Sequence, residues 1–370
     1  MKRRTILIDF AGATTHFTRQ LEAALKDANL TKTRSISIRP GVGNTKSLVL
    51  TLWNSFIRLA SIPINYIVLL IDIVTCLPNQ IFIFNIPLIP SVETFFLWII
   101  RVNGAVSVGI LHNHIPSHGE KKPIRNYRYF EFYNYCDIVV FHDSSISEIF
   151  QSIFPNAVPL YTSLPSYSVP NASDNKTQKI MDSEIIKLGF MGTIRPYKNL
   201  EIISSEFKLL NKSQLSFLSL KITGKAFYDI DNMVRIFENI GFYEFVYNGE
   251  LISDEKFFKE MSEYDFLLLP HANSSGSALL SVAASLGVPV IASNLTVFTD
   301  FVHRFGNGVI FDHLITGDLH RVVSKLIEDK ILREKLKVNA LRAVSSVPTW
   351  SNYVNDIFEC CNELVTRRVQ

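Results

Sequence analysis

The sequence predicts an α/β protein made of two Rossmann-like domains, each a doubly wound parallel sheet. Short apolar stretches alternate with helical stretches along the whole chain, which is typical of such folds. One polar segment rich in Pro, Ser and Asn, residues 166–184, interrupts the alternation and reads as an interdomain linker. With 47% hydrophobic and 19% charged residues, the 370-residue chain has enough apolar material for two cores.

The part of the chain before the linker, residues 1–165, is expected to form the first domain. A helix is expected at 14–27, and apolar helices between residues 46 and 101. Strands are predicted at 5–10, 34–38, 80–84, 105–111 and 137–141.

The part after the linker, residues 185–346, is expected to form the second domain, and a closing helix follows in 347–370. Strands are predicted at 185–191, 218–223, 244–247, 265–269, 288–292 and 309–311. Helices are expected at 200–210, 229–239, 254–263, 276–286, 317–344 and 349–365. Two such domains place a ligand in the cleft between them, at the carboxyl ends of the strands.

The apolar run 59–77 is long enough to raise the question of a membrane span. Pro63, Asn65 and Asp72 interrupt it, and an acidic residue near the centre of a spanning helix is costly. A single span would also put strands 5–10 and 80–84, which should share a sheet, on opposite sides of the bilayer. We therefore expect a helix that lies in the membrane interface or is buried.

Charge is distributed unevenly along the chain. Residues 1–130 contain fifteen Lys or Arg against six Asp or Glu, a net charge of +9, whereas the whole chain carries +3. A basic, apolar front suits an anionic membrane surface or a phosphate-bearing acceptor, although a soluble basic domain gives the same count. The four cysteines lack metal-site spacing and indicate free thiols in a reducing compartment.

Two loops of the second domain combine features of an anion site. Segment 191–199 (MGTIRPYKN) follows a predicted strand and places Gly192, Arg195 and Lys198 at the start of a helix. Segment 270–278 (PHANSSGSA) puts several helix-capping residues and a glycine in the same context. Taken alone, each loop is also compatible with solvated cations or an ordinary helix cap.

Together these segments resemble the donor half of GT-B glycosyltransferases of the group 1, or family 4-like, kind found in bacterial surface-polysaccharide synthesis. Residues 192–199 resemble that family's diphosphate loop, 249–256 (GELISDEK) its base-binding loop, and 275–290 its nucleotide helix and following strand. The resemblance implies catalytic roles for Arg195 and Lys198. It implies donor-binding roles for Gly192, Thr193, Leu251, Ile252, Ser274, Ser275, Gly276 and Ser277. Gly12, in the loop after the first predicted strand, is also expected to bind the donor, near its phosphates or near the acceptor.

One departure from the family pattern concerns the helix before Gly287. Many members carry two Glu residues eight positions apart, of which the later holds the ribose hydroxyls and the earlier faces the donor sugar. Here these positions are Ser274 and Val282. The departure leaves the donor and the choice between retaining and inverting stereochemistry open.

Three histidines follow a predicted strand of the first domain in segment 111–118 (LHNHIPSH). The segment resembles the His-containing loop of polysaccharide glycosyltransferases, which implies that His112 is catalytic and contacts the donor sugar. A zinc site is the alternative, although no spacing fixes a tetrahedron there. Asn113, His118 and His142 are expected on the acceptor or sugar side.

The expected reaction is attack of an acceptor hydroxyl on the anomeric carbon of an NDP-hexose, with the nucleoside diphosphate leaving. No metal is expected, because Arg195, Lys198 and the helix start at 275–277 can stabilise the leaving diphosphate in place of a divalent ion. No cofactor is expected, because the G-x-G-x-x-G and G-x-x-x-x-G-K-[ST] motifs are missing from the sequence. The expected partners are the nucleotide sugar, a lipid-linked or saccharide acceptor and the inner face of the cell membrane, with a cytoplasmic, peripheral location and no nucleic acid. A sugar-nucleotide epimerase of the same fold and a non-catalytic partner of a transferase remain alternatives.

Overall fold

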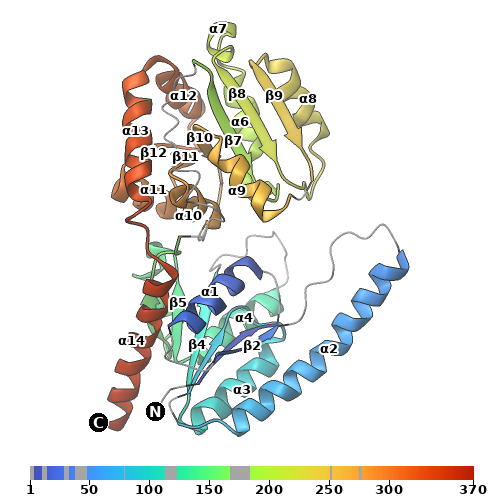
Figure 1. Cartoon of the computed structure of the whole chain (residues 1–370), viewed down its shortest axis with the longest axis vertical. Coiled ribbons are helices and arrows are strands. Elements are labelled where there is room, and N and C mark those ends of the chain that lie inside the picture. The colour runs from blue at the N-terminus through green and yellow to red at the C-terminus, as the bar shows by residue number, and fades with distance from the viewer. Residues whose placement is uncertain are drawn as a thin grey trace. The chain divides into compact units, whose positions relative to one another are not determined.

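The computed structural model describes residues 4–10, 15–28, 33–37, 48–78, 80–112, 123–166, 184–250, 252–274 and 277–370. It has the predicted α/β fold, with two six-stranded sheets that are parallel throughout (Figure 1). The chain divides into two compact units. Unit 1 comprises Met1–Ser163 and Thr349–Gln370, and unit 2 comprises Leu164–Pro348.

The sheet of unit 1 has the strand order β2-β1-β3-β4-β5-β6. The strands are β1 (Thr5–Asp9), β2 (Thr33–Ser37), β3 (Ile81–Phe84), β4 (Val106–Leu111), β5 (Ile138–Phe141) and β6 (Val158–Tyr161). β6 is absent from the sequence prediction. It is an edge strand with half-exposed residues and an internal Pro159, so it lacks the apolar run that marks the central strands.

The helices of unit 1 are α1 (Thr15–Asp27), α2 (Leu48–Val74), α3 (Pro90–Val102), α4 (Pro123–Tyr135), η1 (Ser144–Ile146), α5 (Phe150–Ile153) and α14 (Trp350–Val369). α2 is one continuous helix despite Pro63. α4 is also absent from the sequence prediction, because aromatic, Arg and Asn residues mix around it without a clean apolar stripe, although Phe132 and Tyr133 are fully buried. No helix in the described ranges combines the length and apolarity needed to cross a membrane.

The sheet of unit 2 has the order β12-β11-β10-β7-β8-β9. Its strands are β7 (Ile186–Met191), β8 (Leu218–Thr223), β9 (Glu244–Asn248), β10 (Phe266–Leu269), β11 (Val290–Ser293) and β12 (Gly308–Phe311). Two apolar clusters contain side chains of this sheet, and its central strands β7, β10 and β11 are almost entirely buried.

The helical elements of unit 2 are η2 (Pro196–Lys198), α6 (Leu200–Phe207), α7 (Lys212–Leu215), α8 (Asp231–Ile240), α9 (Asp254–Ser262), α10 (Ala278–Ser285), α11 (Thr296–Phe305), α12 (Asp318–Glu328) and α13 (Lys330–Ala343). The single helix predicted at 317–344 is therefore wrong. Asp329 breaks it, because its backbone is not helical and its side chain accepts a hydrogen bond of 2.8 Å from Leu332 N.

The strand order of each sheet reverses at one point. In unit 1 the reversal lies between β1 and β3, and in unit 2 it lies between β7 and β10. Open α/β sheets bind ligands outside the carboxyl ends of the strands at such switch points. A functional site is therefore expected in the loops that follow these four strands.

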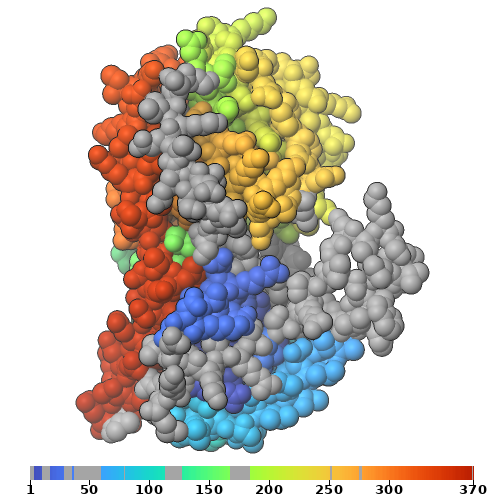
Figure 2. All heavy atoms as spheres, viewed as in Figure 1, coloured from blue at the N-terminus to red at the C-terminus, as the bar shows by residue number. Residues whose placement is uncertain are grey.

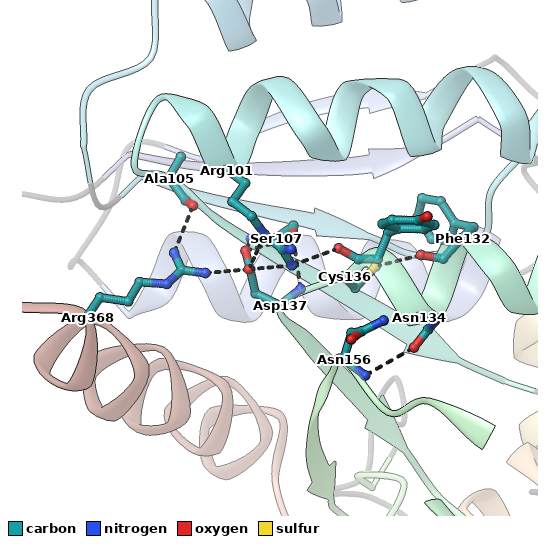
Figure 3. Close-up of polar contacts among 10 residues, drawn as sticks. Arg101, Ala105, Ser107, Phe132, Asn134, Cys136, Asp137, Asn156 and Arg368 are labelled. Carbon is teal, nitrogen blue, oxygen red and sulfur yellow. Dashed lines mark hydrogen bonds and ion pairs between the residues drawn. The ribbon is translucent and has the colours of Figure 1, made fainter. Parts of the chain in front are cut away.

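The closing helix α14 follows unit 2 in sequence but packs into unit 1, beside α1 (Figure 2). Val354, Ile357 and Cys361 have no exposed surface. Near its end, the Arg368 guanidinium pairs with the buried Asp137 carboxylate, which Arg101 also contacts at 3.1 Å (Figure 3). α14 is thus an integral part of unit 1.

Candidate functional site

The loop after β7 brings two cations to the switch point of unit 2. β7 is followed directly by Gly192, whose φ of 94° favours glycine. A Cβ at Gly192 would lie 3.1 Å from Lys198 Nζ, so the lysine head is folded back over the backbone that follows the strand. Arg195 stacks on Phe227, with Cζ 4.2 Å from the ring centroid.

Lys198 is a nearly buried cation, with 6% of its surface exposed. Burial, and secondarily the charge of Arg195, lowers the pKa of its ammonium to about 8. Neither Lys198 nor Arg195 pairs with a carboxylate in the described part of the chain. Two neighbouring positive charges without a counter-ion form a site that favours an anion.

The loop after β10 adds a residue that the sequence reasoning missed. His271 is 3% exposed, and within the described ranges neither of its ring nitrogens has a hydrogen-bond partner. Its ring lies 6.0 Å from Tyr197 and 5.3 Å from Phe298, measured between centroids. Burial, followed by the charge of Lys198, holds the histidine pKa well below its usual value. The available signal was its position directly after a strand, inside a loop already singled out.

One backbone hydrogen bond joins these two loops, and a side chain of β11 holds the second loop. Ala272 N donates to Tyr197 O at 2.8 Å, and Ser293 Oγ donates to His271 O at 2.6 Å. Asn199 directly follows η2 and adopts the left-handed conformation that asparagine tolerates better than most residues. The arrangement fixes Lys198 and His271 on neighbouring rigid segments.

The other predicted donor residues fall into three groups. Ser277 caps α10 by accepting from Leu280 N at 3.3 Å, and Ile252 packs against the apolar core. Thr193 and Ser274 are half-buried in loops after strands. Leu251, Ser275 and Gly276 lie outside the described residues.

Val282 occupies one of the two positions at which this sequence lacks the Glu pair of the family pattern. It is 4% exposed and belongs to the apolar cluster that contains Met191. The position that holds a ribose-binding carboxylate in many family members is therefore part of the hydrophobic core in this chain.

In unit 1, polar residues follow four adjacent strands. Asp9 ends β1, and Asn85, His112 and His142 directly follow β3, β4 and β5. These strands are neighbours in the sheet, so the four side chains share its carboxyl edge. Of the sequence predictions, His112 and His142 come together here, with ring centroids 6.1 Å apart.

Hydrogen bonds link this row into a chain. Thr18 Oγ1 donates to Asp9 Oδ2 at 2.6 Å, Asn85 Nδ2 donates to Thr18 Oγ1 at 2.9 Å, and His112 Nε2 lies 2.6 Å from Asn85 Oδ1. We call Asp9, Thr18, Asn85 and His112 the unit 1 relay. Sequence reasoning found only its last member, because the other three are separated in sequence and meet only through the sheet.

Both imidazoles are held neutral at physiological pH. Burial, together with the neighbouring His142, lowers the pKa of His112 to about 3. Burial lowers the pKa of His142 to about 4, although its Nδ1, 2.9 Å from Thr162 O, opposes the shift. A neutral imidazole can form hydrogen bonds with a hydroxyl group, and it carries no charge that would attract an anion.

Several predicted residues of unit 1, Gly12, Asn113 and His118, lie outside the described residues, as does His114 of the alternative zinc site. Within the residues that are described, no three His, Cys, Asp or Glu side chains gather as metal ligands would.

Comparison with known proteins gives a family match over part of the chain and a fold over nearly all of it. Residues 172–343 match the family model of glycosyl transferases group 1. No curated protein is detectably related to the chain in sequence.

Solved structures match over almost the whole chain. Sucrose-phosphate synthase from Thermosynechococcus elongatus matches with a TM-score of 0.70 and 13% identity, covering 99% of this chain and 100% of the other. Anabaena HepE in complex with UDP gives 0.65 and 12%, covering 97% and 100%. WaaG, a glycosyltransferase involved in lipopolysaccharide biosynthesis, gives 0.59 and 12%, covering 94% and 96%.

These likenesses agree with the two parallel sheets and their strand orders. The chain has the GT-B fold, and its residues 172–343 match the family model of glycosyl transferases group 1.

Proposed function

We propose that the protein transfers a hexose from a nucleoside diphosphate sugar to a lipid-linked or polysaccharide acceptor. The observation that carries the proposal is the pair Arg195 and Lys198 at the switch point of unit 2, which has no carboxylate partner among the described residues. A diphosphate supplies the negative charge that this pair lacks. The structural neighbour HepE was solved in complex with UDP, which supports a nucleotide donor.

The chemical step needs stabilisation of the charge that develops on the leaving diphosphate. Arg195 and Lys198 are fixed before the reaction, so their contribution requires no reorganisation at the moment of bond breaking. We propose that these cations serve in place of a divalent metal. His112 and His142 contact sugar or acceptor hydroxyls from unit 1, and His112 belongs to the catalytic set.

The membrane part of the proposal rests on an apolar surface of unit 1. Ile64, Ile67, Ile71 and Val74 of α2, and Phe95, Trp98 and Val102 of α3, are 56–65% exposed; we call these the α2–α3 apolar face. The acids of these helices turn inward: Asp72 pairs with Arg4 at 2.8 Å, and Glu93 accepts from Tyr66 Oη at 3.0 Å. An apolar surface without exposed acids suits peripheral binding to an anionic cytosolic membrane face.

The pathway we propose is bacterial surface-polysaccharide synthesis, either exopolysaccharide, capsule or O-antigen. A membrane-bound acceptor agrees with the α2–α3 apolar face, and the structural neighbour WaaG is involved in lipopolysaccharide biosynthesis. The structural neighbour sucrose-phosphate synthase leads to the competing expectation of a soluble acceptor.

The test is a screen of nucleotide sugars with membrane extract as acceptor, run with wild type, Arg195→Ala and Lys198→Ala. Transfer by the wild type and losses of about 10²–10³-fold in each variant are expected for the removal of one electrostatic contact. Conversion of the free nucleotide sugar without an acceptor would instead indicate an epimerase. Nucleotide binding without turnover would indicate a non-catalytic partner.

A further inference from the structure

Tyr66 of α2 is linked to both loops that flank the switch point of unit 1. Its ring lies 4.6 Å from that of Phe10, measured between centroids, and Phe10 directly follows β1. Its hydroxyl donates to Glu93 Oε1 at 3.0 Å, and Glu93 stands near the start of α3, the helix that comes after the loop following β3. One residue of α2 therefore connects to the backbone on both sides of the switch point.

Glu93 is the part of this connection that holds the loop after β3. It has no exposed surface, and its two carboxyl oxygens accept from Leu88 N and Ile89 N, each at 3.0 Å. These two residues directly precede α3, so the carboxyl group pairs backbone donors at the helix start much as a capping box does. The same loop begins at Asn85, in the row of polar residues at the carboxyl edge of the sheet.

The contact between Tyr66 and Glu93 strengthens this hold. Burial, followed by the charge of Glu93, raises the pKa of Tyr66, so its hydroxyl keeps its proton and donates. Burial raises the pKa of the Glu93 carboxyl to about 7, against the opposing effect of its three donors. Removal of the Tyr66 donor should therefore weaken the hold on the loop, because the ionised form that accepts most strongly becomes less favourable.

α2 turns a different side to the outside. Ile64 and Ile67, close to Tyr66 in sequence, are 61% and 59% exposed and belong to the α2–α3 apolar face. Tyr66 itself is half-buried and packs against the apolar core of unit 1, with its ring centroid 5.9 Å from that of Phe96 of α3. α2 packs along α3 (Figure 1), so it joins an exposed apolar surface to the loops at the sheet edge.

We propose that Tyr66 is a positioning residue that, through Phe10 and Glu93, holds the two switch-point loops of unit 1 in the geometry that the acceptor requires. For the acceptor this inference rests on the proposed function, whereas the hold on the loops does not depend on it. The two loops adjoin Asp9 and Asn85 of the polar row. A small displacement at a site costs much of the rate, so a residue outside the site can control turnover in this way.

The first measurement is hydrogen exchange of the backbone amides of Leu88 and Ile89 in the full-length protein. Tyr66→Phe keeps the ring and removes only the hydroxyl. The two amides should then exchange about tenfold faster, the effect of losing about one net hydrogen bond. Tyr66→Leu also removes the ring contact with Phe10 and should accelerate their exchange further.

Ser107→Ala is the matched control. Ser107 Oγ donates to the buried Asp137 carboxylate at 2.9 Å, near the amino end of β4 and so at the opposite edge of the same sheet. The variant loses a buried hydrogen bond to a carboxylate, and some stability with it, but it leaves both switch-point loops as they are. It should keep wild-type exchange at Leu88 and Ile89 and wild-type turnover per folded molecule.

Turnover and nucleotide affinity separate positioning from a loss of stability. With nucleotide sugar and membrane extract, turnover per folded molecule should fall about tenfold in Tyr66→Phe and about 10²-fold in Tyr66→Leu. Affinity for UDP, with GDP in parallel, should stay within twofold, because the proposed nucleotide site lies in unit 2. Glu93→Gln should also lose turnover, and its combination with Tyr66→Phe should lose little more than the larger single loss, because both act through one contact. Additive losses would contradict a shared contact.

Unchanged exchange at Leu88 and Ile89 in both Tyr66 variants would overturn the inference, and so would faster exchange with wild-type turnover per folded molecule. An equal loss of turnover in Ser107→Ala would reduce the effect to lost stability and overturn it as well. A wild type that transfers no sugar from any nucleotide sugar would sink the proposed function, and the positioning of an acceptor with it, while the exchange rates would still decide the hold on the loops. If Tyr66→Leu does not fold, Tyr66→Phe still carries the comparison.

Discussion

Lys198 is a buried cation that lowers the stability of the fold, and in the proposed function it offsets this cost by binding a ligand. Its ammonium is nearly buried beside Arg195 and has no carboxylate partner in the described ranges, so its pKa falls to about 8 from the usual 10.5. This shift corresponds to a destabilisation on the order of 3 kcal/mol when the charged form is kept at neutral pH. A bound diphosphate would reverse the shift by neutralising both cations.

The first prediction is that Lys198→Met stabilises the free protein while it abolishes nucleotide binding. Between pH 8 and 10.5 the unfolded chain holds the Lys198 proton more tightly than the folded chain, so wild-type stability should rise with pH across this window. The variant should unfold at a higher temperature at pH 7 and lack this rise. Thermal denaturation of both proteins tests it, with the exposed Lys225→Met as control; a less stable Lys198→Met would contradict the account.

The second prediction concerns the paired imidazoles of unit 1. His112 and His142 have folded-state pKa values of about 3 and about 4, against 6.5 when unfolded, so the unfolded chain takes up their protons first as the pH falls. Unit 1 should therefore lose stability from about pH 6.5 down to pH 4, by up to about 1.4 kcal/mol per pH unit for each histidine. His142→Gln should lose stability less steeply in urea titrations over this range; equal slopes would refute the assignment.

At the scale of elements, the sequence predicts central strands better than edges and interruptions. The strands β1, β3, β4, β7 and β10 are mostly apolar, and the predicted bounds lie within a residue or two of the observed ones. β6 is not predicted, because an edge strand does not need an apolar run. The break at Asp329 is not predicted either, because a single capping residue interrupts a sequence pattern that is helical on both sides of it. The loop after β7 that contains the two cations is predictable because all of its residues lie within one short segment that directly follows the strand.

The relay and His271 are not predictable in this way, because their meaning depends on partners far along the chain. Asn85 and His112 are 27 positions apart, and Asn85 and Thr18 are 67 apart. His271 stands out only once burial and the absence of a ring-nitrogen partner among the described residues are known. Sequence identifies residue types at strand ends, but the order of strands in the sheet decides which of them meet.

The third prediction concerns the α2–α3 apolar face. Wild type should sediment with vesicles that contain anionic lipid and be partly released by salt, because unit 1 combines apolar exposure with positive charge. Trp98→Ser should weaken sedimentation, since Trp98 is 61% exposed and stacks near Phe95, with ring centroids 6.1 Å apart. Leu314→Ser, at an 80% exposed position of unit 2, is the matched control. Equal sedimentation of the two variants would exclude this face as the contact.

The fourth prediction concerns the attachment of α14 to unit 1. Arg368 contacts the buried Asp137 and donates to Ala105 O at 3.4 Å, and its side chain is only 34% exposed. Arg368→Met should lower the free energy of unfolding by about 1–2 kcal/mol, less than a fully buried pair because solvent screens part of the interaction. Its neighbour Arg367, 72% exposed, pairs with Glu363 only at 3.8 Å, so Arg367→Met should be neutral. Chemical denaturation compares them, and matching values would show that the Asp137 contact adds no stability.

At the scale of the whole molecule, the proposed function divides the chemistry between the two units. Unit 2 has the cations and the family match, and unit 1 has the neutral imidazoles, the relay and the exposed apolar face. A transferase needs both, because an anion site alone binds a nucleotide without moving a sugar. Nucleotide affinity and turnover should therefore respond to different sets of substitutions.

The measurement that tests this division most directly is calorimetric titration of UDP, with GDP in parallel, into wild type, Lys198→Met and His112→Ala, alongside turnover of each. The account predicts that Lys198→Met loses nucleotide affinity and turnover together, whereas His112→Ala keeps wild-type affinity and loses turnover. Wild-type affinity in Lys198→Met, or equal loss of affinity in both variants, would contradict the assignment of the donor site to unit 2.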